Sequence, residues 1–142
     1  MFLLDTNVVS ELRKIGVGRA DPHVVAWAQS VPSDRMFLSS IVIQELEIGT
    51  MLAERRDPPQ GAILRKWLEG YVLPSFADRI LPVDLVIARR SAALHAPNPR
   101  PLSDSLIAAT ALVHGMTVVT RNIADFETCG VALVNPWDAP HP

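Results

Sequence analysis

Short apolar runs alternate with longer segments of helical periodicity along this chain. Five of these runs are too short for helices and suit buried strands, namely 2–4, 36–39, 80–83, 116–120 and 131–134. Between them, apolar residues recur at helical spacing, which predicts helices over 8–14, 22–30, 41–56, 60–76, 85–95 and 103–114. The segment 96–102 contains three prolines and is predicted to be a loop.

Alternation of strands and helices is typical of an α/β fold, in which a mainly parallel sheet is flanked by helices in three layers, α/β/α. A chain of 142 residues, 49% of them hydrophobic, fits a single domain spanning 1–142 with a substantial core. In such sheets, ligands bind outside the carboxyl ends of the strands. Functional side chains are therefore expected at those ends.

Composition narrows the class of protein. The formal net charge of −2 gives no general attraction for nucleic acid, so any basic binding surface has to be local. The lone Cys129 cannot form an internal disulfide, and the absence of a Cys/His pattern argues against zinc, which together favour a reducing compartment. The longest uncharged stretch, 105–120, is shorter than the roughly 20 apolar residues of a membrane span. With no signal-peptide pattern, we expect a soluble, cytoplasmic protein without a membrane partner.

Four acidic residues are expected at or beside the carboxyl ends of the strands, and three of them have an ordinary structural explanation. Asp5 directly follows the first strand, and its ordinary explanation is a helix cap, although Thr6 or Asn7 would provide that cap equally well. Asp104 stands in the first turn of a helix, where the helix dipole favours acids. Asp125 follows a strand in a segment where turn formation explains Asp well. None of the three identifies a site by itself.

A fourth acid, Glu45, lies within the predicted helix 41–56. The residues one helical turn away from it on either side are Ile41, Val42, Ile48 and Gly49, which predicts the buried side of the helix. Burial of an unpaired carboxylate costs several kcal/mol, so a Glu there indicates function. Glu47, by the same spacing, is the more ordinary surface acid.

The four acids indicate a site only if they converge. Two carboxylates about 5 Å apart repel each other by roughly 3 kcal/mol at an effective dielectric constant near 20. Four in one cleft require a cation, and a hard divalent ion such as Mg²⁺ or Mn²⁺ prefers carboxylate oxygen and water as ligands. Convergence therefore predicts a divalent metal site.

Several short motifs occur in order along the chain. They are 2–7 (FLLDTN), 39–40 followed by 45–46 and Gly49, 104–111 (DSLIAATA), 120–122 with 125–126, and the closing 135–137 (NPW). Together they make the chain similar to PIN domains, in particular to the VapC-type toxin ribonucleases of toxin–antitoxin pairs. The resemblance spans nearly the whole chain, although 53–96 contains no matching motif.

The resemblance implies a PIN-like fold and a Mg²⁺-dependent endoribonuclease that cleaves RNA as the toxin of such a pair. Asp5 and Asp104 would coordinate the metal directly, while Glu45 and Asp125 complete the acidic pocket. Supporting roles, in holding metal-bound waters or a phosphate oxygen, fall to Thr6, Thr120 and Asn122. Whether Asn122 or Asp125 lies closer to the metal stays open at this point. The resemblance also implies a homodimer and an antitoxin that blocks the acidic groove with a basic side chain.

RNA has to approach an acidic centre, and five cations are expected near the strand ends or flanking loops, where they would contact backbone phosphates. They are Arg13, Lys14, Arg19, Arg100 and Arg121. The alternative is that these scattered cations only solubilise the surface. The pairs 55–56 and 89–90 are interpreted as solvated helix positions.

Two alternatives to this function stay open: a catalytically silent PIN-fold binding module and a DNA-directed nuclease of the same fold. Retention of all four acids argues against the first. A phosphatase with Asp-x-Asp after strand one is disfavoured because position 7 is Asn, and a receiver domain is disfavoured by Arg121 where a Lys is needed.

Overall fold

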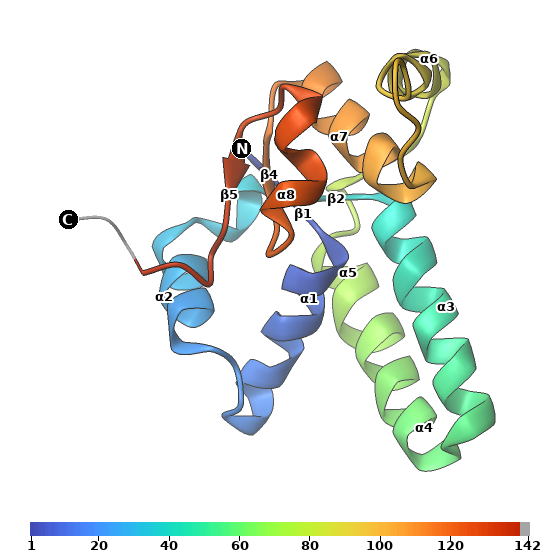
Figure 1. The fold of residues 1–142 in the computed structure, drawn as a ribbon. Helices are drawn as coiled ribbons and strands as arrows, with labels where there is room; N and C mark the ends of the chain where they lie inside the picture. Colours follow the sequence, from blue (N-terminus) through green and yellow to red (C-terminus); the bar gives the residue numbers. More distant parts are fainter. Residues whose placement is uncertain (140–142) are drawn as a thin grey trace.

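The computed structural model describes residues 1–139, which form a five-stranded sheet in the order β3-β2-β1-β4-β5 (Figure 1). The strands are β1 (Phe2–Leu4), β2 (Met36–Ser39), β3 (Ile80–Leu81), β4 (Thr117–Val119) and β5 (Leu133–Val134). Every neighbouring pair of strands is parallel. The predicted α/β fold with a parallel sheet is confirmed, and the last three residues of the predicted domain lie outside the described residues.

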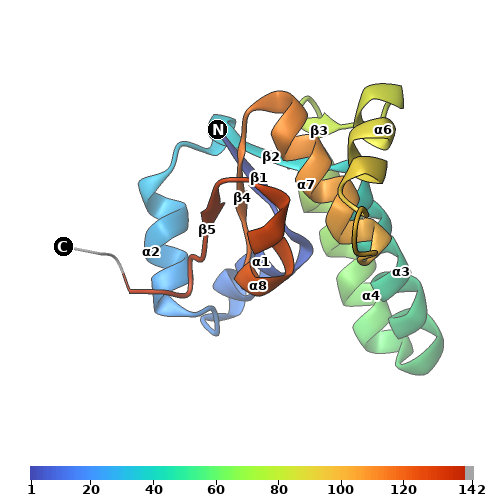
Figure 2. The same cartoon turned by 45° about the horizontal axis from the view of Figure 1, so that its top comes forward.

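Helices connect the strands and lie on both sides of the sheet (Figure 2). The longer ones are α1 (Thr6–Arg13), α2 (Pro22–Ser30), α3 (Ser40–Arg56), α4 (Pro58–Trp67), α6 (Leu85–Ala93) and α7 (Leu102–His114). Short 3₁₀ segments cover Lys14–Val17, Ser33–Arg35 and Glu127–Cys129. The predicted helix 60–76 begins earlier, at Pro58, because proline is compatible with the first helical turn. It continues through a π-helical segment, Leu68–Val72, into α5 (Leu73–Ser75).

One helix was not predicted from the sequence. The segment after β4, expected to be a turn, forms α8 (Ile123–Phe126), which leads into the 3₁₀ segment Glu127–Cys129. Only four residues long, α8 has too few positions for a helical periodicity to show. Its position depends on Phe126, which is fully buried in the core.

The core lies around the three central strands. Leu3, Leu4 and Val118 are fully buried, which explains why these strands appear in the sequence as unbroken apolar runs. From α7, Ile107 and Ala108 pack into the same cluster. Because β1 and β4 are adjacent and parallel, their carboxyl ends meet at one edge of the sheet.

The helices α3 and α4 pack closely against each other and extend away from the sheet (Figure 1). A Cβ atom at Gly61 would lie 2.4 Å from the Cα of Glu54, so only glycine permits this approach. Arg65 of α4 forms ion pairs with Glu47 and Glu54 of α3. Glu47 therefore has a structural partner between the two helices.

No helix within residues 1–139 combines the length and the apolar character needed to cross a membrane.

Candidate active site

Asp5 and Thr120 stand side by side at the carboxyl edge of the sheet. The backbone N–H of Asp5 donates to the carbonyl oxygen of Val119 at 2.9 Å, which fixes the end of β1 against the end of β4. Asp5 is 6% exposed, and Thr120 is fully buried. The first acid of the proposed site is therefore part of the sheet edge and not of a mobile loop.

The carboxylate of Asp5 is held by two donors. The N–H of Thr6 donates to Oδ1 and the hydroxyl of Thr120 donates to Oδ2, both at 2.8 Å. Asp5 is thus the N-cap of α1, and the expectation that capping would not need this residue is wrong. The cap and the site use the same carboxylate, whose geometry is fixed before any ligand binds.

Asn7 is a site residue that the sequence analysis did not single out. Its side-chain N–H group lies 3.4 Å from both Asp5 Oδ2 and Thr120 Oγ1, and its Oδ1 accepts from the N–H of Arg121 at 3.3 Å. Thr120 Oγ1 also accepts the backbone N–H of Asn122 at 3.0 Å. Asn7 and Thr120 therefore join the segments after β1 and β4. The sequence feature that could have identified Asn7 is its position in the motif 2–7.

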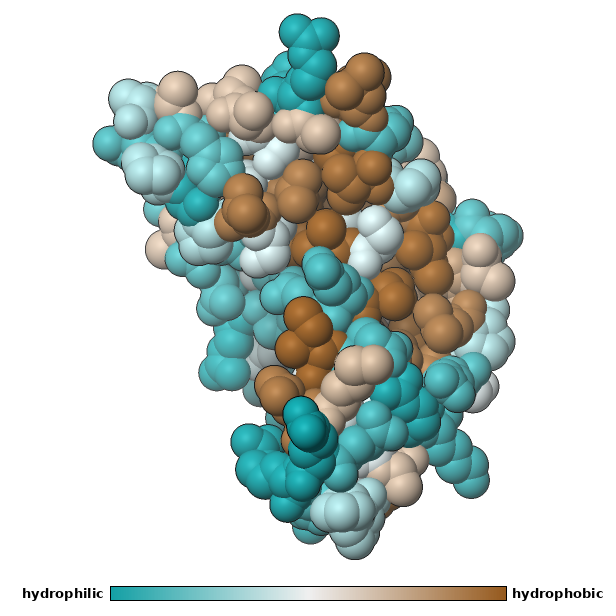
Figure 3. All heavy atoms as spheres, turned by 90° about the vertical axis from the view of Figure 1, so that its right-hand side faces the viewer, coloured by the Kyte–Doolittle hydropathy of each residue, from teal (hydrophilic) through white to brown (hydrophobic). Residues whose placement is uncertain are grey.

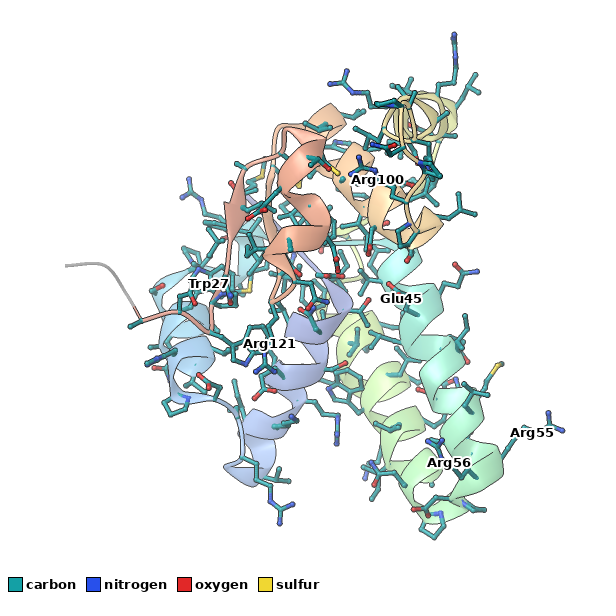
Figure 4. The ribbon with its side chains drawn as sticks, in the orientation of Figure 1. Trp27, Glu45, Arg55, Arg56, Arg100 and Arg121 are labelled. Carbon is teal, nitrogen blue, oxygen red and sulfur yellow. The ribbon has the colours of Figure 1, made fainter. Side chains whose placement is uncertain are left out.

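Glu45 reaches the site from α3 (Figure 4). The hydroxyl of Thr6 donates to Glu45 Oε1 at 2.9 Å, and this hydrogen bond links α1 to α3. The buried stripe of α3 contains Val42 and Leu46, whereas Ile48 is 51% exposed. The expectation that Ile48 lies on the buried side is therefore wrong, and half-buried Glu45 lies at the edge of that stripe, facing Thr6.

Asp104 lies in the first turn of α7 and has a raised pKa. Burial and, after it, repulsion from Asp5, Asp125 and Glu45 together raise this pKa to about 6 from an ordinary 3.8. Arg100 opposes the shift. The charges of Asp5, Asp125 and Glu45 therefore act on Asp104, although the four acids come from four separate helices or strand ends.

Asp5 shares this behaviour. Burial raises its pKa, against the lowering effect of the hydrogen bonds from Thr120 and Thr6, and the charge of Asp125 raises it further. Asp125 is exposed on α8, yet it acts on both Asp5 and Asp104. Asn122 contacts Thr120 only through its backbone. At this edge, Asp125 supplies charge and Asn122 supplies a structural contact.

The residues present fit a hydrated divalent ion. Within 1–139, no three His, Cys, Asp or Glu side chains approach closely enough to form a ligand shell on their own. Mg²⁺ usually retains several waters and binds through one or two carboxylates, so a dense shell is not required. Carboxylates and hydroxyls are hard oxygen donors, and their mutual repulsion, visible in the raised pKa of Asp104, is what a cation would offset.

The cations expected to contact RNA lie in different surroundings. Lys14 forms an ion pair with Glu11 at 3.0 Å, and half-buried Arg100 donates to Cys129 Sγ at 2.7 Å. Arg121 stacks over Trp137 with 5.1 Å between the guanidinium carbon and the ring centroid, and Arg13 lies 6.0 Å from the ring of Trp67. Arg19 is exposed. Only Arg100 is within electrostatic reach of Asp104.

Other candidate residues have structural roles. Arg55 and Arg56 lie at the far end of the α3–α4 pair, away from Glu45 and Trp27 (Figure 4). Burial raises the pKa of the Cys129 thiol despite the neighbouring Arg100, so the thiol stays protonated near neutral pH. Neither group belongs to the acidic edge.

Comparisons with known proteins agree with this site. Residues 2–128 match the PIN domain family. The VapC ribonuclease Y4jK of Sinorhizobium fredii is 40% identical over 143 residues, which cover 97% of this chain and 99% of that protein. The chain belongs to the PIN-domain family. Toxin FitB of Neisseria gonorrhoeae is 39% identical to this PIN domain, over 96% of this chain and 99% of that protein.

Solved structures support the same assignment. FitAcB from Neisseria gonorrhoeae matches this PIN domain with a TM-score of 0.87 and 36% identity, over 98% of this chain and 100% of that chain. A toxin–antitoxin complex from Klebsiella pneumoniae matches with a TM-score of 0.66 and 28% identity, over 98% and 100% of the two chains. The resemblance noted in the sequence is confirmed: this PIN domain is of the VapC type, the endoribonuclease toxins of toxin–antitoxin systems. PIN-domain ribonucleases of this type are generally metal-dependent.

Proposed function

We propose that this PIN domain hydrolyses RNA phosphodiester bonds with Mg²⁺ held at the carboxyl edge of its sheet, and that Mn²⁺ can replace Mg²⁺. The observation that carries the proposal is the hydrogen-bonded cluster at this edge, in which Thr120 holds Asp5 and Thr6 holds Glu45. Asp104 lies near enough for the charges of Asp5, Asp125 and Glu45 to raise its pKa. Repulsion among these carboxylates destabilises the folded protein when no cation is bound, and it favours the binding of a cation. The relatives named as ribonucleases support RNA as the substrate.

Asp5 and Asp104 are the residues that would hold the ion. Asp5 is rigid because Thr6 and Thr120 hold both of its oxygens, and Oδ1, which accepts from Thr6, keeps a further lone pair for a ligand. Asp104, in the first turn of α7, is half-buried. Two carboxylates suit an octahedral ion that keeps several waters.

Bound Mg²⁺ would neutralise charge on the phosphate and acidify a coordinated water. Glu45 and Asp125 would orient the attacking water and accept its proton, and Thr6 orients Glu45 through their hydrogen bond. Thr120 and Asn7 keep Asp5 aligned with the end of β4. Attack by water leaves a 5′-phosphate and a 3′-hydroxyl and needs no 2′-hydroxyl.

Purified protein should therefore cleave single-stranded RNA in Mg²⁺ and lose all cleavage when EDTA removes the ion. Mass spectrometry of the fragments should show 5′-phosphate and 3′-hydroxyl ends. DNA of the same sequence is the control that separates this activity from a DNA-directed nuclease. Cleavage that persists in EDTA, or ends as 2′,3′-cyclic phosphate, contradicts the proposed mechanism.

Metal binding should depend on pH through Asp104. Below its pKa of about 6 this carboxyl is protonated and gives Mg²⁺ a poorer ligand. We expect 10 mM Mg²⁺ to raise the melting temperature by about 3 °C or more at pH 8 and by much less at pH 5. Scanning calorimetry at both pH values, with Na⁺ of equal ionic strength as control, measures the difference. An equal Mg²⁺ effect at both pH values refutes the ligand role.

The protein partner is an antitoxin, as the solved complexes of relatives support. We propose that it inhibits by placing a basic side chain against the acidic edge. An Arg or Lys there would offset the repulsion that raises the pKa of Asp104, in the place of the metal.

A second copy of the chain is the proposed partner of one apolar face. Exposed apolar residues gather on α3, α6 and α7, namely Ile48, Met51, Leu52, Leu85, Val86, Leu102 and Val113. Figure 3 shows brown side chains spread over this side of the molecule. Monomers rarely expose large contiguous apolar patches, and a self-complementary face is what a symmetric dimer needs.

The double substitution Met51→Glu with Val86→Glu should convert the dimer to a monomer. Charge placed in a dry interface costs several kcal/mol, enough to weaken dimerisation by about a hundredfold or more. Light scattering after size exclusion measures the mass. Val17→Glu, at a site 69% exposed in a separate segment, is the control. A wild-type mass that is already monomeric at 100 µM refutes the dimer.

A further inference from the structure

A cavity of about 560 Å³ opens beside two of the four acids, between the α6–α7 loop and the segment after β4. These two acids, Asp104 and Asp125, form part of its wall, so the cavity adjoins the proposed site of hydrolysis. The rest of the lining comes from the end of α6, from the loop, which includes Arg100, and from Thr128. Its volume falls within the roughly 300–1,000 Å³ of small-ligand sites.

Three prolines stiffen the loop wall. Pro97, Pro99 and Pro101 all line the cavity, and each proline ring fixes its own backbone torsion. Asn98 is exposed between two of these rings and is the neutral amide of the lining. An amide group both donates and accepts hydrogen bonds, which makes it suited to the edge of a heterocycle.

Hydrogen bonds hold the loop at both ends. His95 Nε2 lies 2.9 Å from the buried hydroxyl of Ser105, and the N–H of Arg100 donates to His95 Nδ1 at 3.4 Å. The guanidinium of Arg100 then donates to Cys129 Sγ, which ties the loop to the segment that follows α8 (Figure 4). These hydrogen bonds hold the loop wall in place, so little ordering of the loop would oppose binding.

The lining selects among the parts of an RNA strand. The lining carries two carboxylates and one guanidinium, that of Arg100, so its formal charge is negative and disfavours a phosphate that has no metal beside it. Proline rings and an amide suit a flat, neutral, hydrogen-bonding ring. Single-stranded RNA is recognised through such rings, by contact with their faces and hydrogen bonds to their edges. The acids at the cavity end place the neighbouring phosphate where the metal is proposed to act.

We propose that this cavity binds the base of a nucleotide adjacent to the cleaved phosphate and that Asn98 hydrogen-bonds the edge of that base. The inference rests on the proposed ribonuclease function and adds to it a determinant of cleavage sequence. It makes the α6–α7 loop the specificity element, while the acids supply the chemistry.

The test compares cleavage of an RNA library that is randomised around the scissile bond. Wild-type protein should prefer one base at a flanking position, and Asn98→Ala should reduce that preference about fivefold, the worth of a single hydrogen bond. Thr128→Trp, which fills the cavity, should raise KM about tenfold or more for all sequences. In both variants, the Mg²⁺ concentration that gives half-maximal cleavage should be the same as in the wild type.

Gln29→Ala and Gln29→Trp, at an exposed amide on α2, are the matched controls and should change neither preference nor KM. An unchanged base preference in Asn98→Ala, or a wild type without preference at both flanking positions, overturns the inference while leaving the ribonuclease function intact.

A second measurement separates the two proposals. Asp104→Asn protein, in which hydrolysis is expected to be impaired, is titrated with a preferred oligoribonucleotide and with the same strand lacking the one base. The intact strand should bind about tenfold more tightly, and that difference should vanish in Asp104→Asn with Asn98→Ala. Equal binding of the two strands refutes the base site whether or not the wild type cleaves RNA.

Discussion

The substitution Asp104→Asn is expected to reduce RNA cleavage by a hundredfold or more while it makes the protein more stable. The loss follows because an amide cannot replace a charged metal ligand, and single electrostatic groups in active sites contribute about 10²- to 10³-fold. The gain follows because burial disfavours the charged carboxylate and three other acids repel it. Opposite changes in activity and stability are what a strained functional site predicts.

The gain in stability should depend on pH. Because the folded pKa of Asp104, about 6, lies above its ordinary value of 3.8, the folded state loses stability as pH rises through this interval. Above pH 6 the penalty is complete, at about 1 kcal/mol once solvent screening is included. In metal-free buffer, Asp104→Asn should thus melt about 3 °C higher than wild type at pH 8 and at the same temperature near pH 3.5.

Asp34→Asn, at an exposed acid in the 3₁₀ segment before β2, is the control for removing one negative charge. It should leave both cleavage and melting temperature unchanged. A wild-type rate in Asp104→Asn would end the proposed mechanism, and a lower melting temperature at pH 8 would remove its electrostatic basis.

The substitution Phe126→Ala is expected to lower the free energy of unfolding by about 3–5 kcal/mol, the range found for large core aromatics. Phe126 is fully buried and belongs to the main core cluster. It also anchors α8, which positions Asp125. Urea unfolding measures the loss of stability, and cleavage assayed at a temperature where the variant is still folded measures the effect on Asp125.

Ile63→Ala, at a side chain that is 57% exposed on α4, is the matched control and should change stability by less than about 0.5 kcal/mol. If Phe126→Ala unfolds at the urea concentration of the wild type, α8 is not held by this residue. If it is destabilised yet cleaves at the wild-type rate when folded, Asp125 has no role that depends on the position of α8.

The sheet was predictable because its central strands are buried on both faces. Phe2–Leu4 and Thr117–Val119 appear as short apolar runs for that reason, and the parallel order follows from the helices between them. The helix α8 was not predictable from a local pattern, since four residues show no periodicity and Phe126 holds them by a tertiary contact. Strand order, which sets β1 beside β4, also arises from tertiary packing.

In the candidate site, too, local sequence patterns predicted some features, and others depend on tertiary contacts. Asp5 could be found because it ends a buried strand, and its neighbour Thr120 because it ends the adjacent one. Asn7 was missed because its contribution lies in contacts to a segment more than a hundred positions away. Lys14 forms an ion pair with Glu11, a local contact at i and i+3, and its contact with RNA stays a prediction.

The pairing of the first strand with β4 has a consequence during translation. Asp5 precedes Thr120 by 115 positions, so the hydroxyl that holds its carboxylate, and the acid Asp125, are synthesised long after it. A chain whose elongation has not yet reached Thr120 therefore carries an unassembled nuclease site. The order of the strands delays assembly of the site until the segment after β4 has been synthesised.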